Sequence, residues 1–212
     1  MVAMPSARSS WARTTGLIYL LYFLTAIATQ ILLSKGFTVP GNATNFISIV
    51  LYIVLGILLY RLFRPSSRNL SLITALFNFA GSAVMLMALF RGGDAPVDPL
   101  LFFGTYCFLI GVLILRSELL PRALGYLISA AGVGWFVFLA PWRIRSLSVS
   151  MEVLGFVGEA ALMLWLLVRG VNEQRWVEQL ASMIQDMVRI TITPEWVGLL
   201  DFQTRFPSAL PL

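Results

Sequence analysis

Six apolar stretches, each about as long as a membrane span, follow one another along this chain and constrain its fold more than any other feature. They cover residues 16–33, 46–63, 70–90, 99–115, 122–140 and 151–168. A helix needs about 20 mostly apolar residues, with a range of roughly 17 to 25, to cross the hydrocarbon core. The stretches do not alternate with period two, and in lipid each backbone group must be satisfied within its own segment. The sequence therefore predicts an all-α bundle of six transmembrane helices.

The composition excludes several classes of protein. Hydrophobic residues make up 58% of the chain and charged residues 12%, against about 25% charged in an ordinary soluble domain. This leaves too little polar surface for a soluble enzyme, a nucleic-acid-binding module or a disordered protein. There is no histidine and a single cysteine, Cys107, which excludes His-based catalysis, His-ligated metals and cysteine clusters. We expect no cofactor and no catalytic activity.

The basic residues predict how the chain is oriented in the membrane, because cytoplasmic loops are enriched in arginine and lysine. With the N-terminus inside, the cytoplasmic segments hold nine of them: Arg8, Arg13, Arg61, Arg64, Arg68, Arg116, Arg122, Arg169 and Arg175. The other side holds four: Lys35, Arg91, Arg143 and Arg145. The sequence thus predicts a multi-pass protein of the cell inner or plasma membrane, with both termini cytoplasmic. The dispersed charges give no reason to expect a nucleic-acid partner.

The first apolar stretch has a second interpretation. Arg8 and Arg13 precede it, and Ala26-Ile27-Ala28 resembles the cleavage site of a signal peptide. The apolar run continues past this triplet to Leu33, which is long enough to span the membrane. A retained helix is therefore favoured.

The chain changes character near Val171, so we expect a transmembrane domain over 1–171 and a cytoplasmic tail over 172–212. Between residues 173 and 189 the apolar side chains Trp176, Leu180, Met183 and Met187 recur at helical spacing. This pattern predicts an amphipathic helix on the inner membrane surface, with lipid as its partner. Docking to another membrane protein or to a second copy of the chain is the alternative, and the sequence leaves the oligomeric state open.

Two acidic residues lie in the sixth stretch, Glu159 near its middle and Glu152 near its outer end. They are seven residues apart and therefore point the same way on a helix, with Gly155 between them and Met163 one turn further in. A charged carboxyl at mid-membrane costs about 2.5–3.5 kcal/mol on insertion scales, so it must be protonated, paired or exposed to water.

Two roles for Glu159 follow. It is either a proton carrier or substrate ligand, with Glu152 at the outer end of a polar path, or a neutral strut hydrogen-bonded between helices. Candidate partners for the strut are Gln30, Asn78 and Tyr106 in the first, third and fourth stretches. Glu152 is better explained as an interfacial residue paired with Arg143 or Arg145.

Four groups of motifs resemble the domain-of-unknown-function 4386 family of prokaryotic integral membrane proteins. They are RTTGLIYLL at 13–21; LLY at 58–60 with RP at 64–65, RNL at 68–70 and ALF at 75–77; FFG at 102–104 with Gly111, RS at 116–117, LPR at 120–122 and LG at 124–125; and GE at 158–159 followed by LWLLVRGV at 164–171. The resemblance implies a helical bundle from a bacterium or archaeon and supplies no activity.

This chain departs from the family pattern at three positions. The family often carries a histidine at the position of Tyr106, an arginine at that of Asn78, and an acidic or amide residue at that of Gly81. If those groups form a polar network with the family's glutamate, this chain has lost part of it, and Glu159 is a remnant or has different partners. We therefore expect a non-catalytic membrane protein with a structural, accessory or sensing role, and a proton-linked carrier using Glu159 is the alternative.

Overall fold

The protein is described by a computed structural model that covers residues 7–93, 95–136 and 145–188, and every regular element in these ranges is a helix. The helices are α1 (Ala7–Ser34), α2 (Thr38–Phe63), α3 (Arg68–Phe90), α4 (Pro99–Ser117), α5 (Arg122–Phe136), α6 (Arg145–Val168) and α7 (Glu173–Val188). The predicted all-α fold is confirmed, and so is the amphipathic helix after Asn172.

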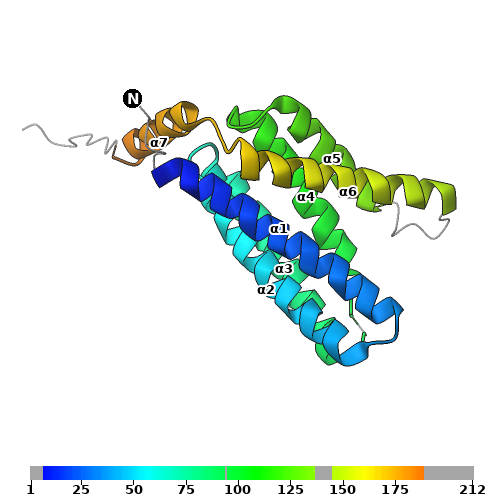
Figure 1. The fold of residues 1–212 in the computed structure, drawn as a ribbon. Helices are drawn as coiled ribbons and strands as arrows, with labels where there is room; N and C mark the ends of the chain where they lie inside the picture. Colours follow the sequence, from blue (N-terminus) through cyan, green and yellow to red (C-terminus); the bar gives the residue numbers. More distant parts are fainter. Residues whose placement is uncertain (1–6, 94, 137–144, 189–212) are drawn as a thin grey trace, which may run out of the picture.

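The first six helices form an up-and-down bundle (Figure 1). Each packs against the next, and α6 returns to pack against α1, so that the bundle closes into a ring. The connections after α2, α4 and α6 lie at the end of the bundle that carries α7, which we call the α7 end. The connections after α1 and α3 lie at the opposite end.

Five helices are long and apolar enough to cross a membrane, namely α1, α2, α3, α4 and α6. The described part of α5 has 15 residues, which is too short to span alone. The predicted span 122–140 runs past Phe136 into residues outside the described part of the chain. The expected six spans are therefore roughly matched, with α5 lying in the ring between α4 and α6.

The helix α2 starts eight residues before the apolar stretch predicted for it. It begins at Thr38 and includes the polar residues Asn42, Thr44 and Asn45. Pro40 is compatible with this start, because the first turn of a helix needs no intrahelical N–H donor. The apolar stretch therefore indicates only the part of α2 suited to the membrane, whereas the helix itself also includes the polar turns before it.

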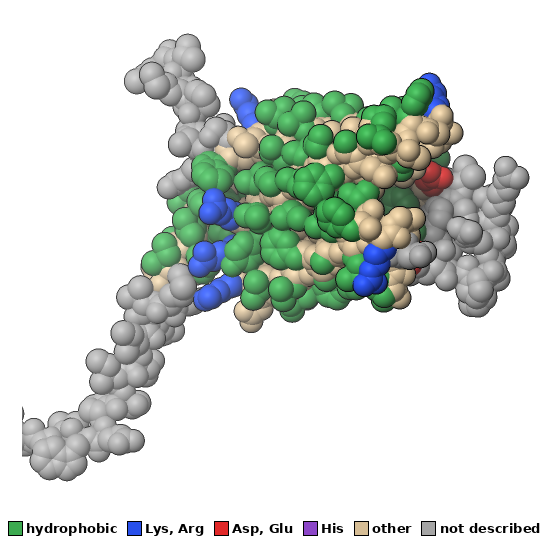
Figure 2. Space-filling model, turned by 90° about the horizontal axis from the view of Figure 1, so that it is seen from below, with side chains coloured by type: hydrophobic (Ala, Val, Ile, Leu, Met, Phe, Trp, Pro, Cys, Tyr) green, Lys and Arg blue, Asp and Glu red, His purple; other side chains and the backbone are tan. Residues whose placement is uncertain are grey.

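The surface is apolar around the middle of the bundle. Figure 2 shows hydrophobic side chains over most of one face, with lysine and arginine side chains gathered toward the two ends. Large hydrophobic residues such as Leu24, Phe79 and Leu164 are about half exposed. A soluble protein of this size rarely exposes so continuous an apolar surface, whereas lipid covers it without a free-energy penalty.

Glycines set how closely the helices approach. At the contact of α4 with α5, a Cβ atom added to Gly132 would lie 2.8 Å from the carbonyl oxygen of Gly104. One added to Gly111 would lie 2.7 Å from that of Gly125. At the crossing of α1 with α6, a Cβ on Gly16 would lie 2.5 Å from the Leu167 backbone nitrogen. Small residues thus allow backbone-to-backbone packing, as in other membrane helix pairs.

Candidate functional site

Glu159 lies on α6 inside the bundle, with 5% of its surface exposed. Two nearby glycines let α5 approach this part of α6. Gly158 faces Ala131, and Gly155 lies beneath the indole ring of Trp135. The close crossing at Gly16 brings the next turn of α1 against α6, and there the Tyr19 hydroxyl donates a hydrogen bond to Glu159 Oε2 at 3.5 Å. This length exceeds the usual 2.7–2.8 Å for hydroxyl donors, so the bond is weak.

Four tyrosines extend from Glu159 across the bundle, and we call them the tyrosine cluster: Tyr19 and Tyr22 on α1, Tyr52 on α2 and Tyr106 on α4. The ring centroids of Tyr19 and Tyr22 are 6.2 Å apart. Tyr22 stacks on Tyr52 at 5.3 Å, and Tyr52 meets the edge of Tyr106 at 5.5 Å. The cluster therefore joins three helices of the bundle with aromatic contacts worth about 0.5–1.5 kcal/mol each beyond area burial.

Tyr106 belongs to this cluster and Asn78 contacts it, but neither forms a hydrogen bond with Glu159 in the described part of the chain. Asn78 is fully buried on α3, and its Nδ2 donates to the Tyr52 carbonyl oxygen at 3.2 Å. Its Oδ1 lies against Gly56 on α2 and has no hydrogen-bond partner among the described residues. The Tyr106 hydroxyl is also buried, and it has no hydrogen-bond partner among the residues that the structure describes. Neither residue is therefore a hydrogen-bond partner of Glu159 in the described part of the chain.

Gln30 and Glu152 lie outside the site. Gln30 is exposed on α1, eleven residues beyond Tyr19, and the α1 residue beside Glu159 is Tyr19 instead. Glu152 is exposed although it shares a helix face with Glu159. The reason is that α6 crosses α1 obliquely, so α1 covers this face only along part of its length (Figure 1). Arg143 and the side chain of Arg145, the predicted partners of Glu152, lie outside the described residues.

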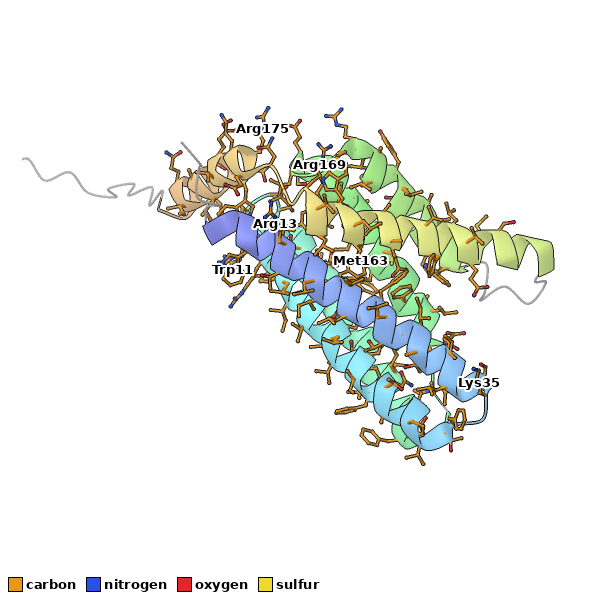
Figure 3. The ribbon with its side chains drawn as sticks, viewed as in Figure 1. Trp11, Arg13, Lys35, Met163, Arg169 and Arg175 are labelled. Atoms are coloured by element: carbon orange, nitrogen blue, oxygen red, sulfur yellow. The ribbon has the colours of Figure 1, made fainter. Side chains whose placement is uncertain are left out.

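Met163 follows Glu159 on the same face of α6. It lies one turn beyond Glu159 on α6, is 5% exposed, and belongs to the same buried core as Tyr19 and Tyr106. Figure 3 shows it closer to Arg13 and Arg169 at the α7 end than to Lys35 at the opposite end. The next side chain on this face of α6 toward the α7 end is therefore apolar and buried.

The helix α7 docks on the α7 end of the bundle through polar contacts with its own chain. Trp176 Nε1 donates to the Leu62 carbonyl oxygen at 3.1 Å, and Gln179 Nε2 donates to the Ser117 carbonyl oxygen. Both carbonyls belong to the last turns of α2 and α4, where the carbonyl oxygens have no N–H donor within their own helix. Arg175 also lies 3.7 Å from Glu118, on the surface. The amphipathic helix therefore caps two helix ends, a role that its apolar periodicity did not indicate.

The hydrogen bond that Glu159 accepts comes from the Tyr19 hydroxyl. The part of the chain described contains no cluster of three or more Cys, Asp or Glu side chains that could hold a metal ion. The Tyr19 hydroxyl is itself a titratable group, so the site pairs one carboxyl with one phenol.

Sequence reasoning did not identify Tyr19, Tyr22 and Tyr52. Tyr19 and Glu159 are 140 residues apart, so their contact depends on α6 returning to α1. A usable signal was present, because Tyr19 and Tyr22 are spaced i, i+3 within an apolar span and share one helix face.

Comparison with known proteins gives a family match without an activity. Residues 99–170 match the family described as "Domain of unknown function (DUF4386)", which confirms the resemblance over that range. A protein of Archaeoglobus fulgidus named "Uncharacterized protein" is 29% identical over 153 residues, covering 69% of this chain and 94% of its own length. No solved structure matches. The family match includes Tyr106 and Glu159, whereas Tyr19 and Asn78 precede it.

Proposed function

We propose that this protein is a non-catalytic integral membrane component of a prokaryotic cell, with a structural or accessory role, and that Glu159 is a neutral strut between α6 and α1. The enclosure of Glu159 is the observation that carries the proposal. Its side chain is 5% exposed, and its oxygen accepts a hydrogen bond from Tyr19. A carrier would need its carboxyl to reach water from at least one side of the membrane.

The position of Glu152 supports the same role. A polar path would continue from Glu159 toward the outer end of α6, where Glu152 is the next acidic residue on that face. Glu152 is exposed on the outside of the bundle, and between the two residues Gly155 is covered by the Trp135 indole. Close packing of the Trp135 indole on Gly155 is typical of a packed core.

Orientation in the membrane is part of the proposal. Arg61, Arg116 and Arg175 all lie toward the α7 end, whereas Lys35 and Arg91 lie in or next to the connections at the opposite end. Because basic residues favour the cytoplasmic side, we place the α7 end in the cytoplasm. The relative in an archaeon is consistent with a prokaryotic membrane.

Cysteine accessibility tests the proposal directly. In a Cys107→Ser background, which removes the single native cysteine, Glu159→Cys and Glu152→Cys are expressed separately and treated with a membrane-impermeant maleimide from each side. We expect Glu159→Cys to react from neither side until the protein is denatured, and Glu152→Cys to react from outside. Lys35→Cys and Arg116→Cys report the two ends, and we expect them to react from outside and from the cytoplasm, respectively.

Two results would contradict the proposal. Labelling of Glu159→Cys in the folded protein from either side would show a water-filled route to this position and would favour the proton-linked carrier. Labelling of Arg116→Cys from outside would reverse the orientation.

A further inference from the structure

A groove of about 440 Å³ lies at the α7 end of the bundle, between the connection after α4 and the connection after α6. Residues 118–121 and 169–172 line it, together with Trp165 on α6. The two connections are joined by a hydrogen bond from the Asn172 N–H to the Leu119 carbonyl oxygen at 3.0 Å. The volume falls within the range of about 300–1,000 Å³ that is typical of sites for small ligands. Neither Glu159 nor the tyrosine cluster lines this groove.

Two left-handed turns fix the shape of the groove. The C-cap of α4 is Glu118, with a φ of 54°, and Gly170 follows the end of α6 with a φ of 71°. A left-handed residue after a helix turns the chain away from the helix axis and satisfies carbonyls of the last turn. At the end of α6, the N–H groups of Arg169 and Gly170 both donate to the Trp165 carbonyl oxygen. The groove is therefore formed by the backbone of the folded chain before any ligand arrives.

Two charged side chains line the groove, and only one of them is neutralised by ion pairs. Glu118 lies 3.5 Å from Arg122 and 3.7 Å from Arg175. Arg169, by contrast, forms no ion pair with the acidic side chains that the structure describes. Arg175 also pairs with Glu178 at 3.5 Å. This group of five side chains therefore has one positive charge in excess.

An aromatic ring holds Arg169 at the groove. Its guanidinium lies 5.5 Å from the ring centroid of Trp165, in a cation–π contact. A guanidinium that stacks on a ring can still donate its N–H groups to a phosphate. Tryptophan is enriched where the headgroups of a bilayer meet its acyl chains, because its ring is apolar and its N–H is polar.

An apolar strip of α6 lies beside this pair. Leu164 and Val168 each precede one member of the pair in the sequence, and their side chains are 51% and 65% exposed. They are four residues apart and therefore share one helix face. The groove thus places a cation and an indole next to a surface that hydrocarbon chains can cover.

We propose that this groove binds an anionic membrane phospholipid, with its phosphate at Arg169 and a hydrocarbon chain along Leu164 and Val168. This inference relies on the membrane location proposed above. Charge complementarity selects the occupant, because an anionic headgroup neutralises the excess positive charge of the group. A zwitterionic headgroup would leave that excess and bring an ammonium group toward the arginines, where like charges repel.

The probes are dioleoyl phosphatidylglycerol and dioleoyl phosphatidylcholine, which have the same acyl chains and differ in net charge. Each is titrated separately into the detergent-solubilised full chain, and native mass spectrometry counts the lipids retained on each protein. We expect one phosphatidylglycerol to be retained in preference to phosphatidylcholine. Removing one charge contact at the membrane surface lowers affinity by about fivefold, so Arg169→Gln should weaken phosphatidylglycerol binding by about that factor.

Arg68→Gln is the matched control, since Arg68 is exposed at the start of α3, at the α7 end, and does not line the groove. We expect this variant to bind phosphatidylglycerol as the wild type does. Glu118→Gln tests the opposite sign, because it removes the negative charge that lines the groove and releases Arg122 and Arg175 from their ion pairs with it. We expect it to strengthen phosphatidylglycerol binding.

Three results would each overturn the proposal. They are equal retention of the two lipids by the wild type, equal losses in Arg169→Gln and Arg68→Gln, and unchanged or weaker phosphatidylglycerol binding in Glu118→Gln. None of these results depends on the accessibility of Glu159, so this proposal and the proposed function fail independently.

Discussion

The contact between Tyr19 and Glu159 gives a prediction whose size follows from the structure. The bond is 3.5 Å long, and hydrogen bonds between membrane helices contribute about 0.6 kcal/mol on average and about 1.7 kcal/mol at most. We therefore expect a double-mutant cycle of Tyr19→Phe and Glu159→Leu, each of which removes the bond, to give a coupling energy below about 1 kcal/mol. Tyr22→Phe is the matched control, since its ring contacts the cluster, and its coupling to Glu159→Leu should be near zero.

Comparing Glu159→Leu with Glu159→Gln in the same experiment separates a structural strut from a functional residue. Glu159→Leu leaves the buried Tyr19 hydroxyl without its acceptor, and an unsatisfied polar group costs about 1–3 kcal/mol. Glu159→Gln keeps an acceptor and should cost less. Unfolding in mixed micelles by increasing fractions of SDS, followed by tryptophan fluorescence, measures these differences.

A smaller loss of stability in Glu159→Leu than in Glu159→Gln would refute this reasoning. When a polar residue is retained for function at the expense of stability, its replacement by an apolar residue often stabilises the protein. A Glu159→Leu variant that is more stable than the wild type would therefore show that Glu159 is not a structural support. A coupling above about 2 kcal/mol would also contradict the weak bond described for Tyr19.

Two further predictions concern packing. Trp176→Phe keeps an aromatic side chain, although a smaller one, and removes the donor to the Leu62 carbonyl, so we expect a loss of at least about 0.5–1.5 kcal/mol and faster proteolysis after residue 172, measured by limited digestion in detergent. No change in digestion would mean that α7 is not held by this contact. Gly132→Val inserts a branched side chain against the Gly104 carbonyl and the Phe108 backbone, and overpacking should cost about 1–3 kcal/mol in the same unfolding assay. Ala130→Val, on the exposed face of α5, is its control, and equal losses in the two variants would argue against close α4–α5 packing.

The positions of most helices could be predicted from the sequence, because both hydropathy and end signals are local. The stretch 99–115 matches α4 closely, since Pro99 is its first residue and the Asp98 side chain accepts a hydrogen bond from the Leu100 N–H. The tail helix was also predictable from its periodicity, and it ends within one residue of the expected range.

The environment of Glu159 could not be predicted in the same way. Its α1 neighbour is decided by the ring closure of α6 on α1 and by the close crossing at Gly16, neither of which leaves a local pattern. Two of the three candidate partners illustrate the difference. Asn78 is buried, as a polar residue within a span suggests, but it contacts Tyr52, whereas Gln30 is at the exposed face of its helix. To predict which side of a helix faces the interior of a bundle, the packing angles between the helices must be known as well as the sequence.

The protonation of Glu159 tests the central claim most directly. Infrared spectra of the reconstituted protein at neutral pH are compared between the wild type and Glu159→Gln, with Glu152→Gln as the exposed control. A buried neutral strut predicts that Glu159→Gln removes a carboxylic-acid band, whereas Glu152→Gln removes only carboxylate bands. Loss of carboxylate bands in Glu159→Gln, with no carboxylic-acid band in the wild type, would show an ionised group in contact with water and would contradict the account.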